Sequence, residues 1–265
     1  MLRNVFAKSL RDQRRKGVGW TVGLCLFAFM IAGVYPSYST TAKELERFME
    51  RAPAAMRALF GGTDLDTAAG YLHTEVFSFM APMFLILFAV ALGAKAIAGE
   101  ERRGTLDLLM STPVSRRRVA TEKFLAMIVA TCVIGAVLWG ALAIGGAMAS
   151  MDIGAARLGE TVLSCVLLAL VFGSLAFAVA AGTGSTAIPV GVAATVAVTT
   201  FLTDGLAPVV SGLRTYQWLS PFHYFFDAEP LKHGMNPSHA AILVGLSAVF
   251  FLASLAGFER RDLGT

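Results

Sequence analysis

The sequence is poor in charge and rich in apolar residues. Asp, Glu, Lys and Arg make up only 15% of its 265 residues, and apolar residues make up 56%. Soluble domains carry about 25% charged residues, and disordered chains have few apolar ones. With a mean hydropathy of +0.66, this composition excludes a disordered chain and indicates a membrane protein, in which about 20 apolar residues form each spanning helix.

Cysteine is also scarce. The three cysteines, Cys25, Cys132 and Cys165, all lie inside apolar runs. A small secreted scaffold held by disulfides needs many more. We therefore expect these residues to behave as small buried hydrophobic side chains.

Sequence motifs that would supply energy or catalysis are missing. The chain has no G-x-x-x-x-G-K-[ST] phosphate-binding loop, no G-x-G-x-x-G, no H-E-x-x-H and no close Cys/His cluster. We therefore expect no catalytic residue, no metal site and no cofactor in this chain, and no nucleophile–base pair is evident at membrane depth. Ionisable residues are also rare inside the apolar runs, so an ion-driven pump lacks the groups it needs. Energy for any transport is expected to enter from outside the chain.

The apolar runs predict an all-α, polytopic membrane protein with six transmembrane helices. The predicted spans are residues 17–35, 75–98, 119–149, 160–181, 187–203 and 240–258. Residues 1–16 predict a basic amphipathic helix lying on the membrane surface. Gly19 and Gly23 form a G-x-x-x-G pair that would let another helix approach closely.

Two longer polar segments separate the spans on one side. Residues 36–74 predict a surface helix with an apolar stripe that ends at Gly61 and Gly62. Residues 204–239 mix apolar and polar residues and hold four prolines. Both segments are expected on the outer side of the membrane.

The distribution of basic residues predicts the orientation. With the N-terminus inside, fifteen of the 22 Lys and Arg residues fall on the cytoplasmic side and seven on the other. Positive residues favour the cytoplasmic side, so both termini are expected there. The clustering of these residues beside apolar runs favours contact with membrane lipid over nucleic acid.

Residues 99–118, GEERRGTLDLLMSTPVSRRR, form the longest charged stretch after the N-terminus. Thr105 follows Gly104 as a helix cap, and Pro113 lies beyond the end of the short helix predicted between them. One side of that helix is apolar, formed by Leu106, Leu109 and Met110. Such a helix either docks a soluble partner or rests on lipid, and its residues alone do not decide between these alternatives.

Two motifs carry a family resemblance. Residues 98–116 contain an acidic pair, then G-T-L-D-L-L, and then T-P. This order resembles the cytoplasmic segment between the second and third helices of ABC-2 type permeases. The stretch WLSPFHYF, starting at Trp218, is similar to the W-x-S-P-F-x-Y stretch before the last helix of those proteins. With six spans in the same order, the similarity covers nearly the whole chain.

The resemblance implies a permease half that pairs with a second copy, identical or homologous, and with two copies of a separate ABC ATPase that bind ATP and Mg. It implies a prokaryotic cytoplasmic membrane and a coupling helix seated in the ATPase. The residues carried over to that helix are Glu100, Glu101, Gly104, Thr105, Leu106, Leu109, Met110 and Pro113. Residues 205–230, with Trp218, Pro221 and Phe222, resemble outer re-entrant helices that close the exit.

Some residues of the spans suggest a pathway for cargo. Thr195, Thr199 and Thr203 recur every four residues on the fifth span and would offer uncharged hydroxyls, although threonine in a membrane helix often bonds its own i−4 carbonyl. Met80, Met83 and Phe84 would add an apolar wall, or serve only in packing. Together they predict export of a hydrophobic or amphipathic compound, such as a drug, an antibiotic or a lipid-like molecule. The alternative is a membrane anchor or assembly factor that docks a partner without transport.

Overall fold

A computed structural model describes residues 5–56, 67–101 and 115–260. Over these ranges the chain is helical and contains no strand. In this part of the chain six helices are long and apolar enough to cross a membrane, as the composition predicted. Their ranges are Gly17–Tyr38, Ala68–Ala96, Arg116–Met148, Ala155–Thr183, Ile188–Leu206 and Pro237–Arg260.

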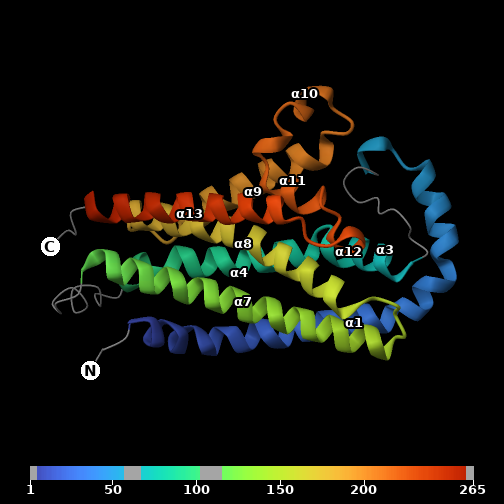
Figure 1. Ribbon diagram of the computed structural model, residues 1–265, viewed down its shortest axis with the longest axis horizontal. Coiled ribbons are helices and arrows are strands. Elements are labelled where there is room, and N and C mark those ends of the chain that lie inside the picture. The colour runs from blue at the N-terminus through green and yellow to red at the C-terminus, as the bar shows by residue number, and fades with distance from the viewer. Residues whose placement is uncertain (1–4, 57–66, 102–114, 261–265) are drawn as a thin grey trace.

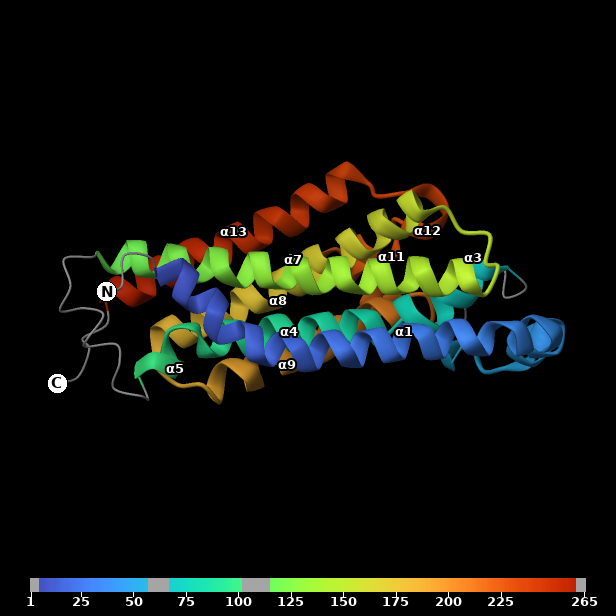
Figure 2. The ribbon, with the colours of Figure 1, turned by 90° about the horizontal axis from the view of Figure 1, so that it is seen from below.

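The first helix is much longer than the first span. α1 runs from Val5 to Arg51 over 47 residues, with Pro36 inside it. The sequence predicted three separate pieces here, and the structure differs by joining them into one helix. Its first turns lean away from the axis of the remainder (Figure 2), and its last part turns away from the bundle (Figure 1). Pro36 accounts for the second of these bends only, because proline removes one backbone hydrogen bond from the helix.

The second span begins earlier than predicted. α3 (Ala68–Leu72) opens it, with the Thr67 hydroxyl accepting a hydrogen bond from the Gly70 amide. A π-helical turn, η1 (His73–Phe77), leads into α4 (Met80–Ala96). The predicted start at residue 75 missed these turns because His73, Thr74 and Glu75 are polar. α5 (Ala98–Glu101) follows directly.

Three long helices complete most of the bundle. α7 (Arg116–Met148) is capped by Ser115, whose hydroxyl accepts a hydrogen bond from the Arg118 amide. α8 (Ala155–Thr183) ends at Gly184, which adopts a left-handed conformation that glycine reaches without strain. α9 (Ile188–Leu206) has Pro189 in its first turn, a position where the missing amide hydrogen costs nothing.

Short helices fill the segment between α9 and the last span. They are α10 (Ser211–Arg214), η2 (Gln217–Leu219), α11 (Pro221–Phe226) and α12 (Pro230–His233). α13 (Pro237–Arg260) then runs back along the bundle. α1 begins and α13 ends at the same end of the bundle (Figure 1), which we call the terminal end; α10 and α12 lie toward the other, the distal end.

α8 forms the centre of the bundle and packs against α4, α7 and α13. Its closest approach is to α4, where a methyl group added at Gly93 would overlap the carbonyl oxygen of Gly173. One added at Gly173 would lie 2.9 Å from the Ala89 Cβ. Small residues thus allow two membrane helices to touch backbone to backbone.

The predicted G-x-x-x-G pair does not make such a contact within the chain. Among the described residues, no atom outside the neighbouring turns of α1 lies within 4 Å of a Cβ built at Gly19 or Gly23. Among the cysteines, Cys165 is buried as predicted, whereas Cys132 is exposed on this chain. Close packing of α4 on α8 therefore depends on Gly93 and Gly173, which no motif singled out.

Candidate functional site

The terminal end carries an ion-pair network centred on Glu100. A carboxylate oxygen of Glu100 lies 2.8 Å from Lys123 Nζ and 3.6 Å from Lys8 Nζ. These residues come from α5, α7 and α1. The network therefore joins three elements where the charged segment of residues 99–118 begins.

Lys123 is the buried member of this network. Its side chain is only 3% exposed, and its ammonium group also donates to the Ala96 carbonyl oxygen at 2.7 Å. Ala96 is the last residue of α4. Because a buried ammonium group needs both charge and hydrogen-bond partners, these contacts fix α7 against the end of the second span.

Further contacts join α1 and α13 to the start of α7. The Phe6 amide donates to Glu122 Oε2 at 3.1 Å, and Glu122 also pairs with Arg118 at 2.9 Å. Arg117 pairs with Glu259 near the end of α13. Together with the Glu100 network, these contacts bring α1, α4, α5 and α13 to the first two turns of α7.

The predicted coupling residues fall partly on this network. Glu100 is its centre, and Glu101 is the last residue of α5. The others lie outside the described residues, namely Gly104, Thr105, Leu106, Leu109, Met110 and Pro113.

The predicted threonine stripe lies on a helix that the rest of the chain covers sparsely. Thr195 and Thr199 are exposed on α9, and Thr203 is half-buried. The Thr203 hydroxyl donates to the Thr199 carbonyl oxygen at 2.8 Å. That bond is the ordinary arrangement of a threonine within a membrane helix, so Thr195 and Thr199 remain the candidates for contact with cargo or a second copy.

The predicted apolar wall is divided between two environments. Met80 is 39% exposed at the start of α4. Met83 is half-buried, and Phe84 packs edge-to-face on Phe27 of α1 with ring centroids 5.4 Å apart. Phe84 also lines a cavity between α1 and α4, whereas Phe79, next to Met80, contacts Phe201 of α9 with ring centroids 5.7 Å apart.

The distal segment is held by aromatic packing. Pro221 starts α11, and Phe222 is buried between Phe172 of α8 and Phe201 of α9. Trp218 is 62% exposed, and its carbonyl oxygen accepts a hydrogen bond from Tyr224. Phe222 therefore anchors the segment, while the Trp218 side chain stays outside the core.

A buried carboxylate, Asp204, lies beneath the same segment. It is 6% exposed and accepts a hydrogen bond from the Gln217 side chain at 3.2 Å. His223 Nδ1 lies 3.5 Å from the same oxygen. Asp204 directly follows the fifth predicted span, residues 187–203. An acidic residue there, followed by Gln217 and His223 in the returning segment, is the sequence feature that could have indicated this cluster.

Comparison with known proteins decides the family. A sequence model described as ABC-2 family transporter protein matches residues 3–263. The chain belongs to the ABC-2 transporter family. A search of curated proteins finds no significant match to this ABC-2 permease.

Membership explains what the sequence lacks. Membrane domains of ABC-2 transporters are non-catalytic, and their ATPase is a separate subunit. This permease is therefore a membrane component that works with an ABC ATPase, and the missing phosphate-binding loop belongs to that partner. Within the described residues, no group of three or more His, Cys, Asp or Glu side chains is arranged to hold a metal.

Proposed function

We propose that this permease is the membrane half of an exporter driven by a separate ABC ATPase, and that it moves a hydrophobic or amphipathic compound outward. The terminal end faces the cytoplasm in this proposal. The observation that supports it best is the Glu100 network, because it connects the beginning of the coupling segment to both α1 and α7.

The network suggests how ATPase movement reaches the membrane helices. The coupling segment, residues 99–118, begins within α5 and ends within the first turn of α7. When the ATPases close, a displacement of this segment acts on α7 directly and on α1 through Lys8. The free energy that couples the ATPase to α1 and α7 is the difference in the free energy of ATPase binding between two arrangements of these helices.

A second permease copy would complete the pathway. α9 is largely exposed and carries Thr195 and Thr199 on its surface together with apolar side chains such as Val192 and Val196. Paired across a two-fold axis, two such faces would enclose a channel of hydroxyl and apolar groups. That lining suits a hydrophobic or amphipathic cargo, including a drug or antibiotic, and we propose a homodimer.

The distal segment would close the exit. Phe222 packs on α8 and α9, so movement of these helices would be passed to α11. Trp218, exposed beside this anchor, is the proposed gate residue. Opening would require the aromatic packing to loosen while Asp204 keeps its contacts with Gln217 and His223.

The test is co-purification with the ATPase and measurement of ATP-dependent transport in proteoliposomes. Leu109→Asp should abolish docking of the ATPase, because a carboxylate would enter an apolar contact. Leu219→Asp is the matched control, since Leu219 is 56% exposed at the distal end, and docking should persist. Intact docking in Leu109→Asp would contradict the coupling assignment, and docking without ATP-dependent transport would favour the membrane anchor.

A further inference from the structure

We propose that the cavity between α1 and α4 at the terminal end binds an amphiphile with an anionic headgroup, taken from the cytoplasmic leaflet. The choice of leaflet rests on the orientation given in the proposed function. The binding itself rests on the shape and chemistry of the cavity.

The cavity has a volume of about 1350 Å³. Pockets for drug-sized ligands measure about 300–1,000 Å³, so this one accommodates a larger molecule. Residues of α1 and α4 form most of its wall, and Glu100, Lys123 and Thr186 complete one end.

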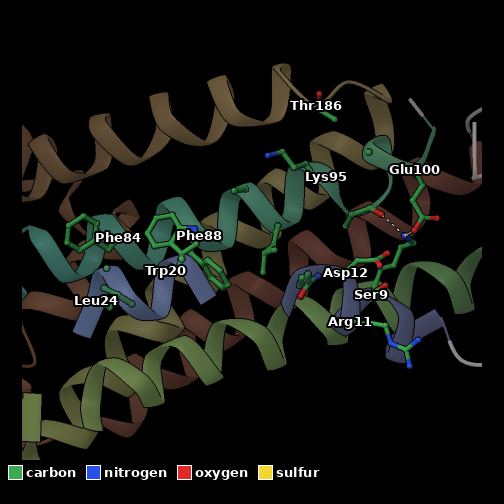
Figure 3. A pocket seen from close by; sticks show the side chains of 18 residues that line it. Ser9, Arg11, Asp12, Trp20, Leu24, Phe84, Phe88, Lys95, Glu100 and Thr186 are labelled. Carbon is green, nitrogen blue, oxygen red and sulfur yellow. Dashed lines mark hydrogen bonds and ion pairs between the residues drawn. The ribbon is translucent and has the colours of Figure 1, made fainter. Parts of the chain in front are cut away.

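One end of the cavity is aromatic and apolar. Trp20 packs edge-to-face on Phe88 with ring centroids 5.6 Å apart, and Leu24 and Phe84 lie beside them (Figure 3). Ala91 and Leu92 of α4 extend this surface. A hydrocarbon chain placed here would lose contact with water without leaving any polar group unpaired.

The other end of the cavity is polar. Ser9, Asp12 and Glu100 gather there, away from Phe84 and Leu24, while Lys95 lies apart from them on the side of α4 toward Thr186 (Figure 3). Because the polar end lies toward the terminal end of the bundle, the cavity changes from polar to apolar in the same direction as one leaflet of a membrane. A molecule with a polar head and an apolar tail matches that gradient.

The charges at the polar end favour an anionic head. Three cations line the cavity, Arg11, Lys95 and Lys123, against two anions, Asp12 and Glu100. Lys123 and Glu100 neutralise each other at 2.8 Å, and Lys8 adds a further positive charge beside Glu100. A negative headgroup near Lys95 would gain from this excess.

One polar atom in the cavity wall lacks a partner. Gln13 lines the cavity, and its Oε1 is buried without a hydrogen bond to any residue that the structure describes. A buried acceptor of this kind is costly unless a donor reaches it. A hydroxyl-bearing headgroup, such as glycerol phosphate, would supply both the donor for Gln13 and the negative charge for Lys95.

Quenching of Trp20 fluorescence tests the proposal. The chain has three tryptophans, so Trp139→Phe with Trp218→Phe leaves Trp20 as the only tryptophan emitter. This variant is placed in lipid nanodiscs that contain brominated phosphatidylglycerol or, at the same mole fraction, phosphatidylcholine with the same brominated chains. Trp20 should be quenched by the anionic lipid at a lower mole fraction than by the zwitterionic one.

Lys95→Gln should weaken this preference by about fivefold, the usual effect of one cation near an anionic headgroup. Lys232→Gln, an exposed lysine at the distal end, is the control and should leave the preference unchanged. Equal quenching by both lipids, or a preference that Lys95→Gln does not alter, would overturn the proposal.

A cavity-filling variant provides an independent check. Gly23 lines the cavity, and a Cβ added there would have no described atom outside its own helix backbone within 4 Å, so the side chain of Gly23→Leu can begin at this position and occupy cavity space. Gly33→Leu lies on the same helix with equally open surroundings but outside the cavity lining. Gly23→Leu should remove the lipid preference and Gly33→Leu should keep it; the opposite result would contradict the site.

The bound amphiphile is either cargo or a resident lipid, and a second measurement separates them. In proteoliposomes with the ATPase, fluorescent phosphatidylglycerol moves between leaflets upon ATP addition if it is cargo and stays if it is resident. Both results are consistent with the binding site. Loss of ATPase docking with intact lipid preference would refute the proposed function alone, and loss of preference with intact docking would refute this inference alone.

Discussion

At the scale of single residues, the terminal end depends on a lysine placed two turns into an apolar helix. Lys123 was counted from the sequence as one of the cytoplasmic positive charges, yet its side chain is 3% exposed. Hydropathy and charge counting report composition, and they contain no information on which neighbour faces a side chain. The sequence feature that could have predicted this ion pair was the acidic pair after the second span, Glu100 and Glu101, together with a lysine near the start of the third span.

Lys123→Met should destabilise the permease strongly. Methionine preserves most of the length of the side chain but leaves Glu100 close to an apolar surface, and removing one partner of a buried ion pair typically costs about 3–5 kcal/mol. Lys8 should offset part of this loss, because it lies 3.6 Å from Glu100. The measurement is the thermal unfolding midpoint of the purified chain in detergent.

The matched comparison is Arg118→Met, which breaks an exposed pair with Glu122 on the same helix. An exposed i,i+4 pair contributes about 0.3–0.5 kcal/mol, so its midpoint should barely move. The double variant Lys123→Met with Glu100→Gln should recover stability relative to Lys123→Met alone. Additive losses in the double variant would show that the two residues do not interact.

Thr199→Leu should change which compounds stimulate the ATPase of the assembled transporter. Thr199 is exposed on α9, where a leucine would replace a hydroxyl with an apolar group on the proposed pathway. Thr200→Val is the control, because the Thr200 hydroxyl bonds the Val196 carbonyl oxygen of its own helix. The measurement is ATPase activity across a panel of amphipathic compounds, and identical profiles for both variants would remove Thr199 from the pathway.

At the scale of elements, the sequence predicted where helices cross the membrane better than where they end. The six spans follow from runs of apolar residues, since no other structure built from such runs satisfies the backbone inside lipid. The continuation of α1 beyond Tyr35 to Arg51 could not be predicted from hydropathy, because a helix can leave the membrane without ending. Pro36 suggested a break, but a proline inside a helix only bends it when the turns on either side keep their backbone hydrogen bonds.

The tight crossing of α4 and α8 predicts that an added methyl group would lower the stability of the bundle. Gly93→Ala should destabilise the bundle by about 1–3 kcal/mol, as overpacking of a tight contact usually does. The added methyl group would overlap backbone atoms of Gly173, which cannot move aside as the tip of a side chain can. The unfolding midpoint of the purified protein reports the change.

Gly140→Ala makes the same chemical change on α7 where no atom lies within 4 Å of the added carbon. This variant should lose no stability and could gain up to about 1 kcal/mol, because alanine has a higher helix propensity than glycine. If both variants lost equal stability, a general effect of the substitution rather than the crossing would explain the loss. If neither variant lost stability, there would be no tight contact at Gly93.

At the scale of the whole molecule, the six candidate spans of the described residues predict that both ends of the chain lie on one side of the membrane. Charge counting assigns the terminal end to the cytoplasm through residues near α1 and α7. The turn between α8 and α9 carries no charged residue, so its side follows only from the number of helices before it. The bundle puts this turn near the same end as the start of α1 (Figure 2), which makes it a sensitive test of the topology.

Single cysteines in a chain without Cys25, Cys132 and Cys165 should therefore label in two groups. Asp152→Cys and Tyr216→Cys lie at exposed positions of the connections that would face outward, and a membrane-impermeant thiol reagent should reach them in intact cells. Ala187→Cys, exposed at the start of α9, should react only after the cells are permeabilised. Labelling of Ala187→Cys in intact cells would place the α8–α9 turn outside. Parity would then require a missing or additional span before α9, and the position of the Glu100 network on the ATPase side would no longer follow from the fold.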